Sequence, residues 1–494
     1  MAPYAYDRLS TLDHSFLLFE RPNAYMHVAS TQIFEIGPLR TPDGGVDAQA
    51  IKDATAASLH RIPRYRQKLR TTPIEGRPVW VDDPTFNIDY HVRHTSLPRP
   101  GTERQLKRLS ARIMQQHLDR RRPLWEIWVV EGLEDDRFAL ISKVHHCMID
   151  GMSGVDLLRI LMSPRPEAEI PDAPLFVPRP APTGAELVRD EIKRRIALPF
   201  QALGDLGEFV AEARDVRRDL SSRLRSLSNM LGRTLRSASE TPLNREIGPH
   251  RRFDWFSMEL EDLKRVRRSL GGSLNDVVLT VVTGAVRRFL DRRQCEPTGL
   301  DFRILAPVSV RSPEEQGALG NRVSAWIVEL PIAEADPRIQ LARISEQTTA
   351  LKESKEAIAA ELLTQAAEFT PTALLALGAR NATRLLPFNL VVTNVPGPQF
   401  PMYMLGARML DIYPHVPLMD QLALGVALMS YDGRLHWGFN ADYDTLPDVH
   451  PFVLDVQAAY AELARLAALG PGESPRETPL PRAAPRGNGA SATP

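Results

Sequence analysis

The chain has 494 residues. A single hydrophobic core does not ordinarily support a chain of this length, so we expect two domains of roughly 150 to 220 residues each. Lys plus Arg equals Asp plus Glu at 61 each, and no overall charge therefore draws the protein toward nucleic acid or anionic lipid. The two cysteines, Cys147 and Cys295, lie far apart without metal-ligand spacing. This excludes a disulfide framework and fits a reducing cytosol.

The first residues and the hydropathy pattern bear on membranes. Residues 1–8 lack the basic and then apolar run of a secretory signal, and no stretch reaches the ~18 apolar residues of a spanning helix. We therefore expect a cytoplasmic protein whose contact with membranes or lipid inclusions is peripheral.

Proline marks the boundary between the two expected domains. Seven prolines lie between residues 163 and 183, where they preclude helix and favour an extended connection. A helix-forming stretch follows from Gly184 to Ser239, and the residues after Gly470 have almost nothing to bury. The predicted organisation is an N-terminal lobe at 1–163, a proline-rich linker with connecting helices at 164–245, a C-terminal lobe at 246–469 and a disordered tail at 470–494.

The N-terminal lobe ends in two strands and a helix. Residues 125–131 and 138–146 are apolar and β-branched, and the acidic turn 132–136 between them predicts an antiparallel pair. A helix is expected to open at Gly151. The histidines at 145 and 146 thus end a buried strand just before a loop, where α/β folds commonly expose side chains to a cleft.

The C-terminal lobe has the same mixed character. Ser257 predicts the cap of a helix at 258–270, Gly271 and Gly272 end that helix, and Ser273 caps a second one at 274–291. The dipeptide Asp432-Gly433 predicts a hairpin turn. Strands are expected at 302–310, 322–330, 388–393 and 422–430, with two long helical stretches between the second and the third. The predicted fold class is α/β, with two lobes of mixed sheets.

One group of residues points to chemistry: His145 and His146, followed by Asp150 and Gly151 at a strand-to-loop junction. Neighbouring side chains on a strand point to opposite faces, so one histidine can reach a shared cleft while the other packs behind it. A metal site needs a third ligand, and adjacent strand histidines diverge, so we expect no metal. A covalent serine hydrolase is disfavoured because Ser153 has glycine on only one side, without the Gly-x-Ser-x-Gly elbow.

The histidine segment resembles the active-site segment of the bacterial wax ester synthase/diacylglycerol acyltransferases. Pro123-Leu124-Trp125-Glu126 and Lys143-Val144 precede it as in that family. Further blocks occur in the family's order, and together they span about residues 6 to 465: Leu9-Ser10-Thr11-Leu12-Asp13, Asn275-Asp276-Val277-Val278-Leu279, Leu319-Gly320-Asn321-Arg322 and Thr393-Asn394-Val395-Pro396-Gly397-Pro398.

The resemblance implies two lobes like those of chloramphenicol acetyltransferase, with flanking helices and an active-site tunnel between the lobes. It implies transfer of a long-chain acyl group from acyl-CoA, as a co-substrate, to diacylglycerol or a fatty alcohol without a covalent acyl-enzyme. No cofactor, metal or nucleic acid is expected. It also implies that Asp150 turns away from the base and pairs with an arginine to hold the loop.

Physical chemistry assigns roles to the other residues. An alcohol is barely ionised at neutral pH, so attack on a thioester needs a base such as histidine, and we assign His146 as that base with His145 in support. Asn275, at a helix start, and Asn394, at the end of a strand, are the candidate donors to the oxyanion. Asn275 is preferred because of the helix dipole, and capping or packing is its alternative role. Thr393, Asn394 and Gly151 are expected to contact substrate.

Two other functions stay open at this stage. A related acyltransferase or condensation enzyme would take its acyl group from a carrier protein or use a secondary metabolite as acceptor. A non-catalytic protein that binds lipid surfaces would have no reason to keep the complete histidine segment. The sequence does not decide between diacylglycerol and fatty alcohol as acceptor.

Overall fold

The computed structural model describes residues 4–74, 76–148, 160–167, 170, 172, 174–194, 196, 237–309, 323–353 and 387–469. Several predictions fall outside these residues. They concern Asp150, Gly151 and the helix after them, most of the 184–239 stretch, the helical stretch after residue 353, and the tail.

The described part of the N-terminal half is built on a six-stranded sheet with the order β12-β13-β2-β7-β6-β5. β6 (Trp125–Leu133) and β7 (Arg137–His145) pair antiparallel, which confirms the predicted hairpin. β2 (His27–Glu35) pairs antiparallel with the other edge of β7, and β5 (Val92–Ser96) pairs parallel with β6. β7 is therefore an interior strand, and most of its side chains are buried on both faces.

Two strands of this sheet come from the C-terminal half of the chain. β13 (Ala407–His415) pairs antiparallel with β2, and the short β12 (Tyr403–Met404) pairs with β13. The predicted lobes at 1–163 and 246–469 stay a prediction. That prediction did not include the transfer of β13 from the C-terminal half into the N-terminal sheet. The exchange ties the two halves together through backbone hydrogen bonds.

The second six-stranded sheet of the described residues has the order β10-β9-β11-β14-β15-β8. Its hairpin turns at Asp432 and Gly433, both at positive φ (43° and 80°), as the dipeptide predicted. The strands are β8 (Arg251–Glu259), β9 (Arg303–Ser309), β10 (Val323–Glu329), β11 (Leu390–Pro396), β14 (Leu424–Tyr431) and β15 (Arg434–Asp442).

One predicted helix start is wrong. Ser257 does not cap a helix, because β8 continues through Glu259 and pairs with β15 along its whole length. The helix α8 spans Leu260–Leu270, and it ends at Gly271 with φ 88° as predicted. The next cap is confirmed: the Ser273 hydroxyl accepts from the backbone N–H of Asp276 at the start of α9 (Leu274–Arg292).

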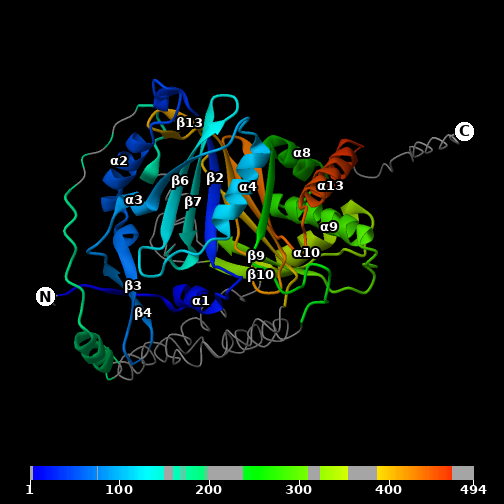
Figure 1. Cartoon of the computed structure of the whole chain (residues 1–494). Coiled ribbons are helices and arrows are strands. Elements are labelled where there is room, and N and C mark those ends of the chain that lie inside the picture. Colours follow the sequence, from blue (N-terminus) through cyan, green and yellow to red (C-terminus); the bar gives the residue numbers. More distant parts are fainter. Residues whose placement is uncertain are drawn as a thin grey trace, which may run out of the picture.

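Helices cover the two sheets from opposite ends of the molecule. Figure 1 shows α8, α9 and α13 (His450–Leu469) gathered beside the C-terminal sheet, and α10 (Pro337–Glu353) packs against α9. On the other side lie α2 (Ala48–Ser58) and α3 (Ile88–His91). The remaining elements are α1 (Thr11–Phe19), α4 (Glu103–Met114), a small sheet of β1 (Asp7–Arg8), β4 (Pro78–Asp82) and β3 (Gln67–Thr71), and the short helices η1 (Gly37–Leu39), η2 (Leu59–Arg61), η3 (Pro63–Arg66) and η4 (His146–Met148).

The two large sheets meet along β13, β15 and β8. At Gly438 a Cβ atom would lie 1.9 Å from the carbonyl oxygen of Pro414, so only glycine allows β15 to approach β13 this closely. Trp255 of β8 stacks on Tyr413 of β13 with ring centroids 4.7 Å apart. Ile33 of β2, Tyr413 of β13 and Phe253 and Trp255 of β8 belong to one apolar cluster, so strands from the two halves of the chain share a core.

Candidate active site

The histidine pair lies where β7 turns into η4. β7 ends at His145, one residue earlier than expected, and His145 is paired in register with His27 of β2. His146 begins η4, and its backbone N–H donates to the carbonyl oxygen of Met26 at 2.7 Å. The turn of the chain thus separates the two side chains, in addition to the alternation of a strand.

His145 is buried, with only 1% of its surface exposed. Its Nε2 atom lies 3.1 Å from Oε1 of Glu20, and its Nδ1 atom accepts the backbone N–H of Cys147 at 3.1 Å. A nitrogen that accepts carries no proton, so this hydrogen bond places the ring proton on Nε2, the ring atom nearest to the carboxylate. His145 therefore packs behind the turn, in the position predicted for the supporting histidine.

His146 lies against helix α1. Its ring stacks on Phe16 with centroids 3.8 Å apart and planes at 22°. Burial lowers the pKa of His146 to about 4, so at neutral pH the ring is uncharged. Within the described residues its Nδ1 atom is buried and has no hydrogen-bond partner. A neutral, half-buried imidazole on a turn can accept a proton from a group placed beside it.

Glu20, the residue that ends α1, was missed by the sequence analysis. Its Oε1 atom accepts the backbone N–H of Met26 at 3.1 Å, and its Oε2 atom accepts from the guanidinium of Arg120. Burial raises the pKa of Glu20, but the contacts with His145 and Arg120 outweigh burial and bring the pKa to about 2. Glu20 is therefore an ionised carboxylate inside the protein. No local pattern signals it, because its histidine partner is 125 residues away.

A second buried ion pair holds the strand that leads to the histidines. The Lys143 ammonium, fully buried, lies 2.5 Å from Oε1 of Glu126 and donates to the carbonyl oxygens of Ile113 and Gln116 at 2.8 and 2.9 Å. These contacts fasten β7 to β6 and to the end of α4. Trp125, at the start of β6, is 1% exposed and donates through Nε1 to the Tyr65 carbonyl oxygen.

The two asparagine candidates meet in the C-terminal sheet. Asn394 lies near the end of β11 and donates through Nδ2 to Oδ1 of Asn275 at 2.7 Å. Asn275 is exposed in the first turn of α9, and the cap of that helix is Ser273, so the capping role considered for Asn275 is wrong. Together they line a narrow cavity of about 40 Å³, whose wall includes Trp326 and Lys352. Thr393 directly precedes Asn394 on β11 and is half-buried.

Asp276, next to Asn275, holds the loop that leads into α9. Its Oδ2 atom accepts the backbone N–H of Ser273 at 2.7 Å, and its Oδ1 atom accepts the hydroxyl of Thr348 at 2.8 Å. The carboxylate is 2% exposed. It therefore joins the start of α9 to α10 and fixes the direction in which Asn275 projects.

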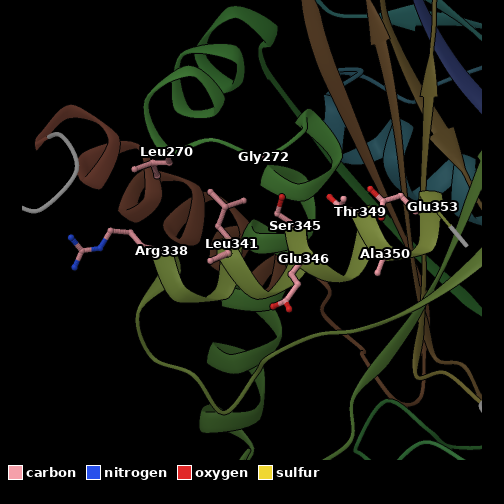
Figure 2. A pocket seen from close by; sticks show the side chains of 10 residues that line it. Leu270, Gly272, Arg338, Leu341, Ser345, Glu346, Thr349, Ala350 and Glu353 are labelled. Atoms are coloured by element: carbon pink, nitrogen blue, oxygen red, sulfur yellow. The ribbon is translucent and has the colours of Figure 1, made fainter.

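A larger hollow is lined by a different set of residues. Figure 2 shows it between α10 and the turn from α8 to α9, with a volume of about 530 Å³. Its charged lining includes Arg338, which pairs with Asp336 at 2.9 Å. Neither histidine of the pair and neither asparagine lines this hollow, so it is separate from the predicted site residues.

Neither a metal-ligand cluster nor a single membrane-spanning helix occurs among the described residues. In that part of the chain no group of three or more His, Cys, Asp or Glu side chains is arranged to hold a metal ion. There, too, no single helix is long and apolar enough to cross a membrane; α8 and α9 pass the test of length and composition only as a pair bent by 96°.

The fold defines the class of protein. The wax ester synthase/diacylglycerol acyltransferase from Marinobacter aquaeolei VT8 superposes with a TM-score of 0.64 at 27% identity, over 94% of this chain and all of that one. The first condensation domain of the calcium-dependent antibiotic synthetase gives 0.58 at 15% identity, over 94% and 96% of the two chains. The chain thus has the two-lobed, mixed α/β fold that was predicted, shared by acyltransferases and condensation domains.

Sequence comparison narrows this class to a family. The wax ester synthase/diacylglycerol acyltransferase catalytic domain matches residues 9–278, and the C-terminal domain of the same family matches residues 319–464. A putative diacylglycerol O-acyltransferase of Mycobacterium bovis and a probable one of Mycobacterium tuberculosis are each 31% identical over 475 residues, covering 93% of this chain and 96% of the relative. This chain belongs to the wax ester synthase/diacylglycerol acyltransferase family, and it is an O-acyltransferase.

Proposed function

We propose that the protein transfers a long-chain acyl group from acyl-CoA to diacylglycerol, to a fatty alcohol or to both, with His146 as the general base and no covalent acyl-enzyme. The observation that carries the proposal is the state of His146. Its ring is uncharged at neutral pH, and it lies on the turn directly after the buried strand β7.

The proposed reaction moves one proton through His146. The imidazole accepts the proton of the acceptor hydroxyl while the hydroxyl oxygen attacks the thioester carbonyl carbon. The tetrahedral intermediate then collapses, the carbon–sulfur bond breaks, and the CoA thiolate leaves with the proton that His146 had taken. Atoms and charge balance without any enzyme nucleophile.

Asn275 is the proposed donor to the oxyanion. Its amide oxygen accepts from Asn394, which leaves its NH2 group as the part of the amide turned away from that partner. The first turn of α9 adds the positive end of a helix dipole. Asn394 thus serves the site by orienting Asn275, and Thr393 and Gly151 are proposed to contact substrate. Asp150 is proposed to hold the loop.

Contact with lipid is proposed to be peripheral. Large apolar side chains are exposed at Ile74, on the turn between β3 and β4, and at Leu175 and Ile192 beyond it, at 80%, 90% and 53% of their surface. An insoluble acceptor has to be taken from a membrane or a lipid inclusion, and such side chains favour that surface.

A single assay tests the proposal. The protein is incubated with palmitoyl-CoA and vesicles that contain both diacylglycerol and hexadecanol, the vesicles are floated, and products are separated by chromatography. We expect vesicle-bound protein, triacylglycerol or wax ester as product, intersecting initial-rate plots and no acyl group on the denatured protein. Parallel plots with a trapped acyl-enzyme would replace the mechanism. Product formed only from an acyl carrier protein would replace the donor.

A further inference from the structure

Glu20 accepts two hydrogen bonds and lies in close contact with a histidine. Its carboxylate accepts the backbone N–H of Met26 and the guanidinium of Arg120, and its Oε1 atom lies 3.1 Å from Nε2 of His145, at ion-pair distance but without an aligned hydrogen bond. His27 is farther away, with its Nε2 atom 3.9 Å from the same oxygen, Oε1. The helix that Glu20 ends, α1, packs against η4, and its Phe16 stacks on His146. The carboxylate is thus beside the turn but does not touch His146.

The connection to His146 runs through His145. Because Oε1 of Glu20 is an acceptor, it favours the form of the His145 ring that has its proton on Nε2. That form leaves Nδ1 free to accept the backbone N–H of Cys147. The accepted hydrogen bond joins residues 145 and 147, and so it closes the backbone around His146.

We propose that Glu20 is a positioning residue for the base: it fixes the protonation form of the His145 ring, and His145 in turn fixes the backbone turn that carries His146. The proposal rests on the proposed function, in which His146 accepts the proton. It assigns to the N-terminal helix a part in acyl transfer that goes beyond packing.

The charge of Glu20 is needed because its two oxygens face donors on both sides. In Glu20→Gln, an amide oxygen kept toward Met26 and His145 would turn the NH2 group against the Arg120 guanidinium. The reverse orientation would place the NH2 group against His145 Nε2, and the ring would move its proton to Nδ1. Nδ1 could then no longer accept from Cys147, and the turn would lose its hydrogen bond.

Glu131 offers a matched control. Like Glu20, it accepts one backbone N–H, that of Val46 at 3.2 Å, and lies close to a histidine, with Oε2 3.3 Å from Nε2 of His94. It lies on β6, toward the end that is remote from the histidine turn. Glu131→Gln therefore makes the same chemical change outside the proposed connection.

The experiment measures the ring and the kinetics separately. In protein labelled with ¹⁵N at histidine, two-bond proton–nitrogen correlation spectra report which nitrogen of His145 carries the proton, with His145→Gln used for assignment. We expect Nε2–H in the native protein and in Glu131→Gln, and Nδ1–H or a mixture in Glu20→Gln. We expect Glu20→Gln to lower kcat about 10- to 100-fold with little change in KM for palmitoyl-CoA, because the base is displaced while the binding surface is kept.

A second variant separates the positioning of His145 by Glu20 from the contact between Glu20 and Arg120. Arg120→Gln removes the outer contact of Glu20 and leaves the one with His145, so kcat should stay within about threefold of the native value. Equal losses in Glu20→Gln and Arg120→Gln would overturn the proposal, as would native kcat in a folded Glu20→Gln. If Glu20→Gln does not fold, the native spectrum decides, and Nδ1–H on His145 would overturn the proposal. Near-native kcat in His146→Ala would instead remove the base itself, so the two failures are distinguishable.

Discussion

The histidine turn and the asparagine pair are held in place by different means. At the turn, charged groups lie beside the chain: the Glu20 carboxylate next to His145, with the exposed Arg120 on its outer side, and the buried Lys143 ion pair two residues before His145. At the asparagine pair, the start of α9 is held by a hydroxyl cap, by the buried Asp276 carboxylate and by a neutral amide contact. The proposed base thus directly follows a buried strand, whereas the proposed oxyanion donor lies at an exposed helix start.

The difference matters because buried charges are costly unless every partner is in place. Losing one partner of a buried ion pair costs about 3 to 5 kcal/mol, whereas losing one helix cap costs about 1 kcal/mol. The histidine turn is therefore expected to keep one orientation. This suits the proposed transfer of a proton to His146.

The largest effect is expected at the base. His146→Ala should lower kcat by about 10² to 10⁴, the usual contribution of a general base, while acyl-CoA binding survives. His145→Ala should keep measurable activity and lose mainly stability, because it leaves Glu20 as a buried charge without its imidazole partner. Steady-state kinetics and thermal melts of both purified variants test this. An inactive, fully stable His145→Ala would move the base to residue 145.

A smaller effect is expected at the asparagine pair. Asn275→Ala should lower kcat by about 10², the effect of losing one oxyanion donor, with a nearly unchanged melting temperature. Ser273→Ala is the control, since it removes the helix cap and should cost about 1 kcal/mol of stability with kcat close to native. The two variants change neighbouring residues at one helix start. If Asn275→Ala changes only the melting temperature, its role is packing.

Local signals made much of this fold predictable. The β6–β7 hairpin, the glycines that end α8, the Ser273 cap and the Asp432-Gly433 turn each depend on residues within a few positions of one another. The wrong helix start at Ser257 and the strand exchange, which was not predicted, both depend on pairing between strands that are far apart in the sequence. β8 continues past Ser257 because β15 provides its partner, and β13 leaves its own half to join β2.

In the candidate site, too, residues close together in the sequence were predicted and a contact between distant residues was missed. The histidine segment is recognisable because its residues are consecutive, and the resemblance to a family adds the blocks around Asn275 and Asn394. Glu20 escaped notice because a lone glutamate at the end of a helix is ordinarily a solvated residue. Only the folded chain brings it to within 3.1 Å of His145. Asp150 and Gly151 keep their predicted roles as predictions, since they lie outside the described residues.

The smallest expected effect is the response of kcat to mild acid. With the pKa of His146 lowered to about 4 by burial, the base stays unprotonated from pH 8 to pH 5.5, and kcat at saturating acyl-CoA should change less than about twofold over that range. An imidazole with the ordinary pKa of about 6.5 would instead lose about tenfold by pH 5.5. This flat response of kcat follows from the comparison between the two regions, because burial keeps the proposed base uncharged over this range of pH.

Stability should respond to acid sooner than kcat does. His27 and His146 are both held below their ordinary pKa by burial, so the unfolded chain takes up protons first, and stability is lost as the pH falls from about 6.5 toward 4. Glu20 adds a loss at lower pH, from about 4.5 down to about 2, because its folded pKa is depressed. Melting temperatures and kcat are measured on the same samples, and each sample is returned to pH 7 to exclude irreversible unfolding. A kcat that falls together with the melting temperature, with a midpoint near pH 6.5, would mean that the working base is exposed to solvent and is not the buried His146.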